Sequence, residues 1–119
     1  MNNLEEERDI RVEELTLVKY LVSQAINVPV GLIIPTRVFT MKDSGMGSVR
    51  FKTDKHLPHQ RDLITVNYRD TDNVPILISL DLNIANELYE LDFFKGDYSP
   101  LVTYPIPEKL LIAPIGPDL

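Results

Sequence analysis

The stretch LITVNYRDTDNVPILISLDL, residues 63–82, decides the fold because it contains two strands and the turn that joins them. On each side of its centre, apolar and polar side chains alternate with a period of two, which is typical of a strand with one buried face. The centre, DTDN at residues 70–73, consists of residues that favour turns. The stretch therefore predicts paired strands at about 63–69 and 75–82.

Three further segments on either side of this pair show the same alternation. They predict strands at about 37–41, 48–52 and 87–94, and turn residues separate them from their neighbours. Short connections favour antiparallel neighbours. The five strands therefore predict a mostly antiparallel meander sheet.

The alternation divides the strand residues into a buried set and a water-facing set. We expect the first to pack under a helix and the second to face water, as in most antiparallel sheets. The predicted buried set is Val49, Phe51, Ile64, Val66, Tyr68, Ile76, Ile78, Leu80, Leu82, Tyr89, Leu91 and Phe93. The predicted water-facing set is Arg50, Thr65, Asn67, Arg69, Ser79, Asp81, Glu90 and Asp92.

One amphipathic helix is predicted before the strands, at about 12–26. Its N-cap is either Arg11 or Asp9, and Pro29 ends the helical pattern. A single apolar stripe at helical spacing is formed by Leu17, Val18, Leu21, Val22 and Ala25. A helix followed by a run of strands predicts an α+β fold, with the helix packed on the sheet.

The C-terminal stretch is rich both in proline and in large apolar residues. Five prolines between Pro100 and Pro117 exclude a central strand or a helix interior. The leucines, isoleucines and valine among them are too apolar for a free tail. We expect an extended segment that lies over the domain or over a partner.

Length and composition indicate one folded domain over residues 1–119. A hydrophobic fraction of 44% is too high for a disordered chain. The absence of cysteine excludes disulfides, thiolate catalysis and cysteine zinc sites. The sequence contains no recognisable signal peptide, and its longest apolar run covers only residues 28–35, so we expect a cytoplasmic protein that does not bind membranes.

Acidic residues outnumber basic ones and are unevenly distributed. The net charge of −6 argues against nucleic-acid binding, which requires a basic surface. Residues 70–100 contain seven acids and one lysine, whereas residues 37–69 contain seven bases and three acids. This asymmetry favours steering of a charged partner, although solvation alone also explains charged strands.

No segment carries a recognisable catalytic constellation, and we expect a non-enzymatic protein without a cofactor. The best metal candidate is DKHLPHQRD, residues 54–62, through His56 and His59. Its H-x-x-H spacing with an internal proline differs from zinc motifs, so a polar loop explains it better. The GMGS segment, residues 45–48, is similar to an anion-binding nest but lacks the lysine and helix of a phosphate loop, which favours a plain turn.

Two motifs resemble those of a known group of proteins. They are MKDSGMGSVRF at residues 41–51 and LYELDFFKGDYSPL at residues 88–101, preceded by the helical YLVSQA at residues 20–25. The chain is similar, over residues 8–105, to a family of small uncharacterised bacterial domains with a Met-Gly-Ser turn and an ELD-x-x-K-x-D-[FY]-S-P-L ending. This resemblance implies no activity and assigns no site residue. Small acidic domains of this type are often immunity proteins that neutralise a toxin, which offers an analogy.

The leading hypothesis is a non-enzymatic binding protein, an immunity-type inhibitor of a basic toxin or nuclease. The alternative is a subunit or adaptor that docks on another chain, or forms a homo-oligomer, through the segment 106–119. A third hypothesis is a small metal-dependent enzyme that uses His56 and His59. The candidate partner-binding residues of the leading hypothesis are Asp81, Glu90, Asp92 and Asp97.

Overall fold

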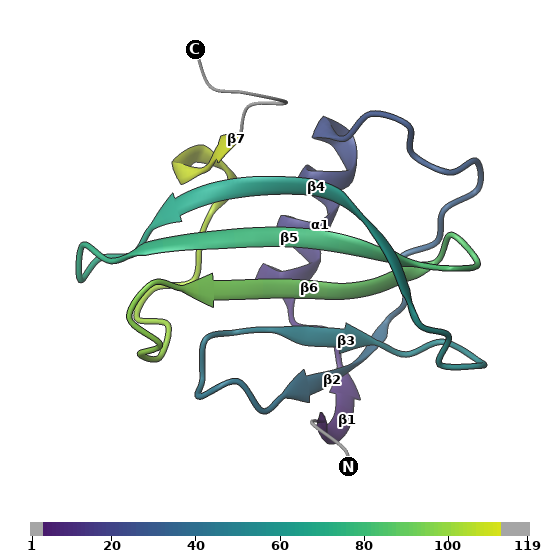
Figure 1. The fold of residues 1–119 in the computed structure, drawn as a ribbon, viewed down its shortest axis with the longest axis horizontal. Coiled ribbons are helices and arrows are strands. Elements are labelled where there is room, and N and C mark those ends of the chain that lie inside the picture. The colour runs from purple at the N-terminus through teal and green to yellow at the C-terminus, as the bar shows by residue number, and fades with distance from the viewer. Residues whose placement is uncertain (1–3, 113–119) are drawn as a thin grey trace.

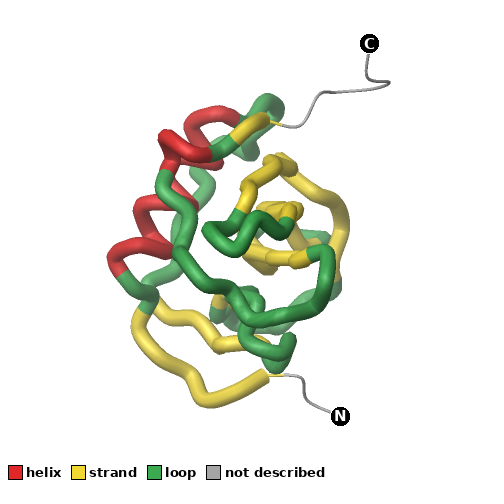
Figure 2. Tube along the Cα trace, turned by 90° about the vertical axis from the view of Figure 1, so that its left-hand side faces the viewer, coloured by secondary structure: helices red, strands yellow, loops and turns green. Residues whose placement is uncertain are grey.

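The computed structural model describes residues 4–112, and every structural statement below concerns this part of the chain. Seven antiparallel strands form one curved sheet in the order β1-β2-β3-β6-β5-β4-β7, and the helix α1 lies on one side of it (Figure 1, Figure 2). This is the predicted α+β class. The elements are β1 (Leu4–Asp9), α1 (Val12–Gln24), β2 (Arg37–Met41), β3 (Val49–Phe51), β4 (His59–Arg69), β5 (Pro75–Asn83), β6 (Leu88–Lys95), the 3₁₀ turn η1 (Pro107–Lys109) and β7 (Leu111–Ile112).

The hairpin of β4 and β5 forms where residues 63–82 predict it. Its turn is closed by a hydrogen bond of 2.8 Å from the Asn73 amide to the Asp70 carbonyl, with Asn73 at φ 69°. Pairing continues back to His59 opposite Asn83, so β4 starts before the predicted residue 63. The other three predicted strands lie within one residue of the predicted ends.

The meander prediction holds within two units, β2-β3 and β4-β5-β6, but not between them, and β1 adds to the first unit from before α1. The units join through β3 and β6, where Val49 pairs with Leu91 and Arg50 with Glu90. Because short connections favour antiparallel neighbours, the predicted meander has β3 beside β4. Residues 52–58 form a connection between these strands that is long enough to avoid this pairing.

The sequence pattern does not predict the edge strands β1 and β7. β1 reads LEEERD, without regular alternation, and it lies along β2 with ion pairs of 2.9 Å from Glu7 to both Arg37 and Lys52. β7 has only two residues, which pair with Val66 and Asn67 of β4. Both strands therefore depend on contacts between segments that are distant in sequence.

The C-terminal segment lies against the domain as far as residue 112, which is one of its two expected placements. The Tyr68 hydroxyl donates a hydrogen bond of 2.9 Å to the Thr103 carbonyl, and Leu110 is buried. Residues 113–119, also part of the predicted segment, lie outside the described residues.

α1 packs its apolar stripe against the sheet and ends at Gln24, two residues before the predicted end. Arg11 is the N-cap residue, and its amide donates to Glu14 Oε1 over 2.8 Å. Glu14 also accepts two hydrogen bonds, of 2.9 and 2.8 Å, from the Arg8 guanidinium, which ties the helix to β1. The fully buried members of the stripe are Leu17, Val18 and Leu21.

The predicted buried set is correct except at Ile64 and Tyr89. Ile64 is only partly buried and Leu63 is buried, while Tyr89 is partly exposed and Leu88 is buried. The strand register shifts near both residues. A β-bulge adds one residue and reverses the alternation, which a pattern of period two cannot anticipate.

Candidate functional site

The outer face of the sheet, opposite α1, gathers charged strand residues into one row. Arg50 of β3 lies opposite Glu90 of β6. Glu90 lies opposite Asp81 of β5, and Asp81 lies opposite Asp62 of β4. Figure 1 looks onto this face, with α1 behind the strands. We call these four residues the charged row, and only strand pairing brings them together.

Arg50 neutralises Glu90 at one end of the charged row. Its Nε and Nη2 atoms both donate to Glu90 Oε2, the first over 2.8 Å. The guanidinium carbon lies 4.4 Å from the centre of the Tyr89 ring, in a cation–π contact. Glu90 is therefore a paired and partly buried carboxylate rather than a free acid.

Asp81, at the centre of the charged row, is buried and does not face water as predicted. The residue is 5% exposed, and its Oδ1 atom has no hydrogen-bond partner among the described residues. Burial, with a further contribution from neighbouring Asp62, raises the pKa of Asp81 to about 8. The prediction fails because alternation assigns a residue to a face without saying how far neighbouring side chains cover that face.

His59 joins the charged row at its β4 end. Its Nε2 atom lies 3.3 Å from Asp62 Oδ1, and its ring meets the Tyr89 ring edge-on at 5.8 Å between centres. One ligand-type atom from each of His59, Asp62 and Asp81 lies within 4.8 Å of the others. His56, the other weak metal candidate of the sequence, is not part of this cluster and lies near Phe39, with 6.1 Å between ring centres.

A second row on the outer face is apolar and exposed. Leu77 of β5 lies opposite Phe94 of β6, and Asn67 of β4 lies between Leu77 and Leu111 of β7. Tyr98 packs edge-on against Phe94, with 5.4 Å between ring centres. The sequence pattern does not reveal this row, although Leu77 and Phe94 occupy strand positions whose alternation is otherwise polar. We call Leu77, Phe94, Tyr98 and Leu111, which are 44%, 44%, 64% and 71% exposed, the apolar row.

Asp92 lies between the charged row and the apolar row. It pairs with Ser79 of β5, which in turn lies opposite Thr65 of β4. Burial, and then the charge of Glu90, raise the pKa of Asp92, while the Ser48 hydroxyl at 3.4 Å acts in the opposite direction. The outer face therefore presents a half-buried acid between an acidic and an apolar region.

Asp97, the fourth predicted partner-binding residue, is not brought into either row. It lies in the turn after β6, where its Oδ1 accepts hydrogen bonds from the Ser99 hydroxyl (2.6 Å) and amide (3.0 Å). These bonds lower the pKa of Asp97. The geometry assigns Asp97 a local role in holding this turn.

The GMGS segment forms the plain turn that the sequence favours. Asp43 accepts the amides of Met46 (3.0 Å) and Ser48 (2.9 Å) with its two carboxylate oxygens. The converging amides therefore hold the protein's own carboxylate and leave no free anion nest there.

The two motifs behind the family resemblance meet in space and hold the fold together. The Ser48 hydroxyl accepts the Phe93 amide over 2.9 Å, and the Leu101 amide donates to the Gly45 carbonyl over 2.9 Å. Gly47 has φ 114°, and a Cβ atom there would lie only 3.3 Å from Leu101 Cδ2. These motif residues are explained by packing and turn geometry.

Lys95, also in the second motif, is a fully buried cation. Its Nζ donates to Asp70 Oδ2 over 2.8 Å and to Asp72 Oδ2 over 2.6 Å. Burial acts to raise the pKa of Asp70, but the bonds from Lys95 and from the amides of residues 102, 103 and 71 outweigh it and lower this pKa to about 2. Two of the seven acids in residues 70–100 are thus committed to the fold.

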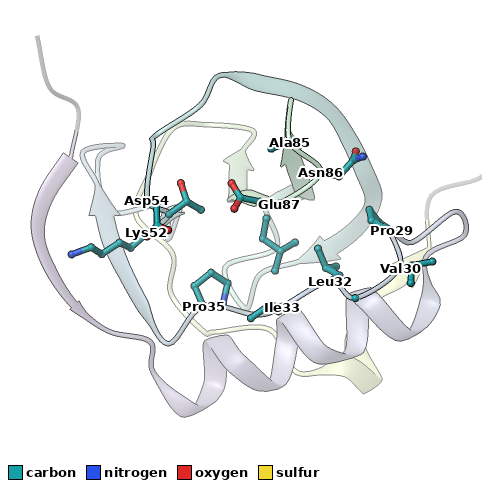
Figure 3. A pocket seen from close by; sticks show the side chains of 13 residues that line it. Pro29, Val30, Leu32, Ile33, Pro35, Lys52, Asp54, Ala85, Asn86 and Glu87 are labelled. Carbon is teal, nitrogen blue, oxygen red and sulfur yellow. The ribbon is translucent and has the colours of Figure 1, made fainter.

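A pocket of about 690 Å³ lies elsewhere on the molecule (Figure 3). Residues 29–35 form one wall, and Lys52, Asp54 and residues 85–88 complete it. Lys52 is already paired with Glu7. Its lining mixes apolar side chains with the charged Lys52, Asp54 and Glu87.

Two further findings are the absence of a membrane-spanning helix from the described residues and a match to a family model. Within the part of the chain that is described, no helix has the length and apolar character needed to cross a membrane. A family model described as Domain of unknown function (DUF6984) matches residues 7–105, close to the range of the resemblance noted above. No curated protein and no solved structure matches the chain.

Proposed function

We propose that this chain, which belongs to the DUF6984 family of domains of unknown function, is a non-enzymatic protein that binds a basic protein partner on the outer face of its sheet. One observation carries the proposal: the exposed apolar row and the charged row lie on the same face of the same strands, with the Ser79–Asp92 pair between them. Apolar and aromatic anchors supply most of the binding energy at protein interfaces. Complementary charge adds specificity and a faster association.

The charges on this face favour a partner that carries lysine or arginine. Asp62 has a side chain that is 57% exposed, and Asp92 is half buried beside the apolar row. Burial, together with neighbouring Asp62, raises the pKa of Asp81, and a cationic group brought next to it would favour its ionised form. A basic side chain from the partner would thus gain a carboxylate that the free protein does not display.

The role that best fits such a face is an immunity-type inhibitor of a basic toxin or nuclease. Covering a cationic substrate-binding surface requires a rigid acidic face and no catalytic group on the inhibitor. A toxin that acts inside the cell would place the inhibitor in the cytoplasm. The same acidic face would repel nucleic acids and anionic membranes.

Site-specific photo-crosslinking in the cells that produce the protein tests the location of the partner site. A photoreactive amino acid replaces Leu77 in the apolar row, and in a control it replaces Val12, which is 80% exposed on α1. We expect a protein of high isoelectric point to be crosslinked at position 77 and not at position 12. Equal crosslinking at both positions, or an acidic partner at position 77, would contradict the proposal.

The C-terminal segment supports a second candidate, a subunit or adaptor that docks or dimerises through its apolar residues. Val102, Ile106 and Leu111 are 61%, 51% and 71% exposed. In this case the chain would form a concentration-dependent dimer or a complex in which position 106, rather than position 77, is crosslinked. Light scattering over a hundredfold range of protein concentration distinguishes a dimer from the monomer that the first proposal expects.

A further inference from the structure

We propose that His59, Asp62 and Asp81 bind a divalent transition-metal ion on the outer face, and that Zn²⁺ fits their chemistry. Each residue contributes one ligand-type atom, and these atoms lie within 4.8 Å of one another. One imidazole nitrogen and two carboxylate oxygens are donors that Zn²⁺ accepts in proteins. This site goes beyond the proposed partner binding; because it shares Asp62 and Asp81 with that surface, a bound ion would compete with a basic side chain of the partner.

The distance between His59 and Asp62 is that of a long hydrogen bond, and it is also one that two ligands of a single ion adopt. His59 Nε2 and Asp62 Oδ1 are 3.3 Å apart. Charge-assisted hydrogen bonds from nitrogen to a carboxylate are about 2.7–2.9 Å long. Two atoms bound to one tetrahedral Zn²⁺ at about 2.1 Å lie roughly 3.4 Å apart. The observed separation therefore matches a shared ion.

Asp81 provides independent support, because it is a buried carboxyl with an unused oxygen. The residue is 5% exposed, and its Oδ1 has no hydrogen-bond partner among residues 4–112. An oxygen of the same carboxyl group lies in the cluster with the ligand atoms of His59 and Asp62. Buried polar atoms are rarely left without a partner, and bound metal ions are one way to satisfy them.

No basic side chain within the described part of the chain neutralises this cluster. Arg50, the cation of the charged row, forms its ion pair with Glu90. Arg61, although it lies next to Asp62 in sequence, donates to the Asn27 carbonyl over 3.3 Å. Neither Asp62 nor Asp81 forms an ion pair with a lysine or arginine among these residues, which leaves the place of a cation open.

Irregular strand pairing brings the three ligands together. In a regular strand, His59 and Asp62 would point to opposite faces because they are three residues apart. The register of β4 against β5 shifts between His59 and Arg61 and again after Asp62, so both side chains reach Asp81. Bulges of this kind re-aim side chains next to functional sites. The sequence pattern, which pairs His59 with His56, does not reveal this set.

Calorimetric titration of Zn²⁺ into the chelator-treated full chain tests the site. We expect one ion per chain. His59→Gln removes one of three ligands and should weaken binding by about tenfold or more. Asp62→Asn and Asp81→Asn should have a similar effect. Because the side chains of His59 and Asp62 are 45% and 57% exposed, the His59 and Asp62 variants should keep the fold, and circular dichroism checks this for all three variants, including that of the buried Asp81.

His56→Gln is the matched control, since it removes an exposed histidine from the loop just before β4 but none of the proposed ligands. It should bind Zn²⁺ as tightly as the wild type. In thermal melts, Zn²⁺ should raise the Tm of the wild type and of His56→Gln equally, and should raise the Tm of His59→Gln clearly less at the same Zn²⁺ concentration.

Two results would overturn the metal site: no saturable Zn²⁺ binding by the wild type, or equal losses in His56→Gln and His59→Gln. Measuring partner binding in the presence of a chelator separates this proposal from the proposed function. If the wild type does not bind Zn²⁺ but still binds the partner, the metal site is refuted and the proposed function is not. The carboxylates of Asp62 and Asp81 then receive a basic side chain of the partner.

Discussion

Two buried acids, one in the turn of the β4-β5 hairpin and one near its opposite end, have different roles in this protein. Asp70 is surrounded by donors, from Lys95 and from main-chain amides, and its pKa is lowered to about 2. Asp81 is buried with one oxygen unpartnered, and its pKa is raised to about 8. Buried polar groups normally have hydrogen-bond partners. Asp70 therefore has a structural role, whereas the unpartnered oxygen of Asp81 is available to a ligand.

The lowered pKa of Asp70 predicts loss of stability at acidic pH. Because the folded state favours the ionised carboxylate, its stabilisation is complete above the unfolded pKa of about 3.9 and decreases as the pH falls towards 2. Urea unfolding of the wild type should show this decrease between pH 4.5 and 2.5. Asp70→Asn should be less stable at pH 4.5, and its unfolding free energy should change less over the same range. A parallel decrease in both proteins would contradict this assignment.

Leu21 tests the contact between α1 and the sheet at the level of one side chain. It is fully buried, so Leu21→Ala should lower the unfolding free energy by about 2–5 kcal/mol. Val12→Ala, on the same helix at a position that is 80% exposed, is the control and should change it by less than about 0.5 kcal/mol. Denaturant melts measure both. A loss below about 0.5 kcal/mol for Leu21→Ala would be incompatible with a core position.

At the level of helices, strands and turns, the irregular parts of the chain determine which side chains reach the outer face more than the regular strands do. The turn at residues 43–48 holds the end of β6 and the segment around Leu101 through Ser48, Gly45 and Gly47. The register shifts in β4 and between β5 and β6 turn Tyr89 and the His59 cluster to the outer face. Irregular strand pairing therefore determines which of these side chains lie on the outer face.

Three glycines allow the turn around Gly47 to be tested. Gly47→Ala meets both an unfavourable φ of 114° and a contact of 3.3 Å, and should cost about 2 kcal/mol or more. Gly31→Ala meets only the unfavourable φ of 75°, with nothing within 4 Å, and should cost about 1 kcal/mol. Gly96→Ala meets neither and should be nearly neutral. Any other order of the three unfolding free energies would refute the role given to Gly47.

In the whole molecule, strand pairing determines which charged side chains lie together on the surface, and these groups differ from the charged segments of the sequence. Of the acids in residues 70–100, Asp70 and Asp72 bind Lys95, and Glu90 binds Arg50. Asp62, from the otherwise basic stretch 37–69, moves into the charged row. The field that a partner meets is therefore set by tertiary structure and differs from the charge of any one segment.

The association rate of the captured partner should depend on this field. Asp92→Lys on the outer face should slow association and flatten its dependence on salt, because interface charge acts within a Debye length of about 8 Å at physiological salt. Glu13→Lys makes the same charge change at an exposed position of α1 and should retain most of the wild-type rate. Stopped-flow kinetics at low and high salt measure both. A wild-type rate that is independent of salt would move the binding surface to the C-terminal apolar residues.

The sequence by itself determines the class of fold because its signals are local. The alternation in residues 63–82 and the stripe around Leu21 depend only on the period of a strand and of a helix, and both predict the observed elements. The family is also readable from two motifs, whose residues turn out to hold the turn at 43–48 against β6.

Only the tertiary structure decides the candidate site. The pairing of β3 with β6, the bulges near His59 and Tyr89, and the burial of Asp81 all result from packing between distant segments. A strand pattern states which side chains share a face, but it does not state which strands are neighbours or where an extra residue reverses the alternation. For this physical reason Asp81 could be placed on the outer face from sequence, whereas its burial beside Asp62 and His59 could not.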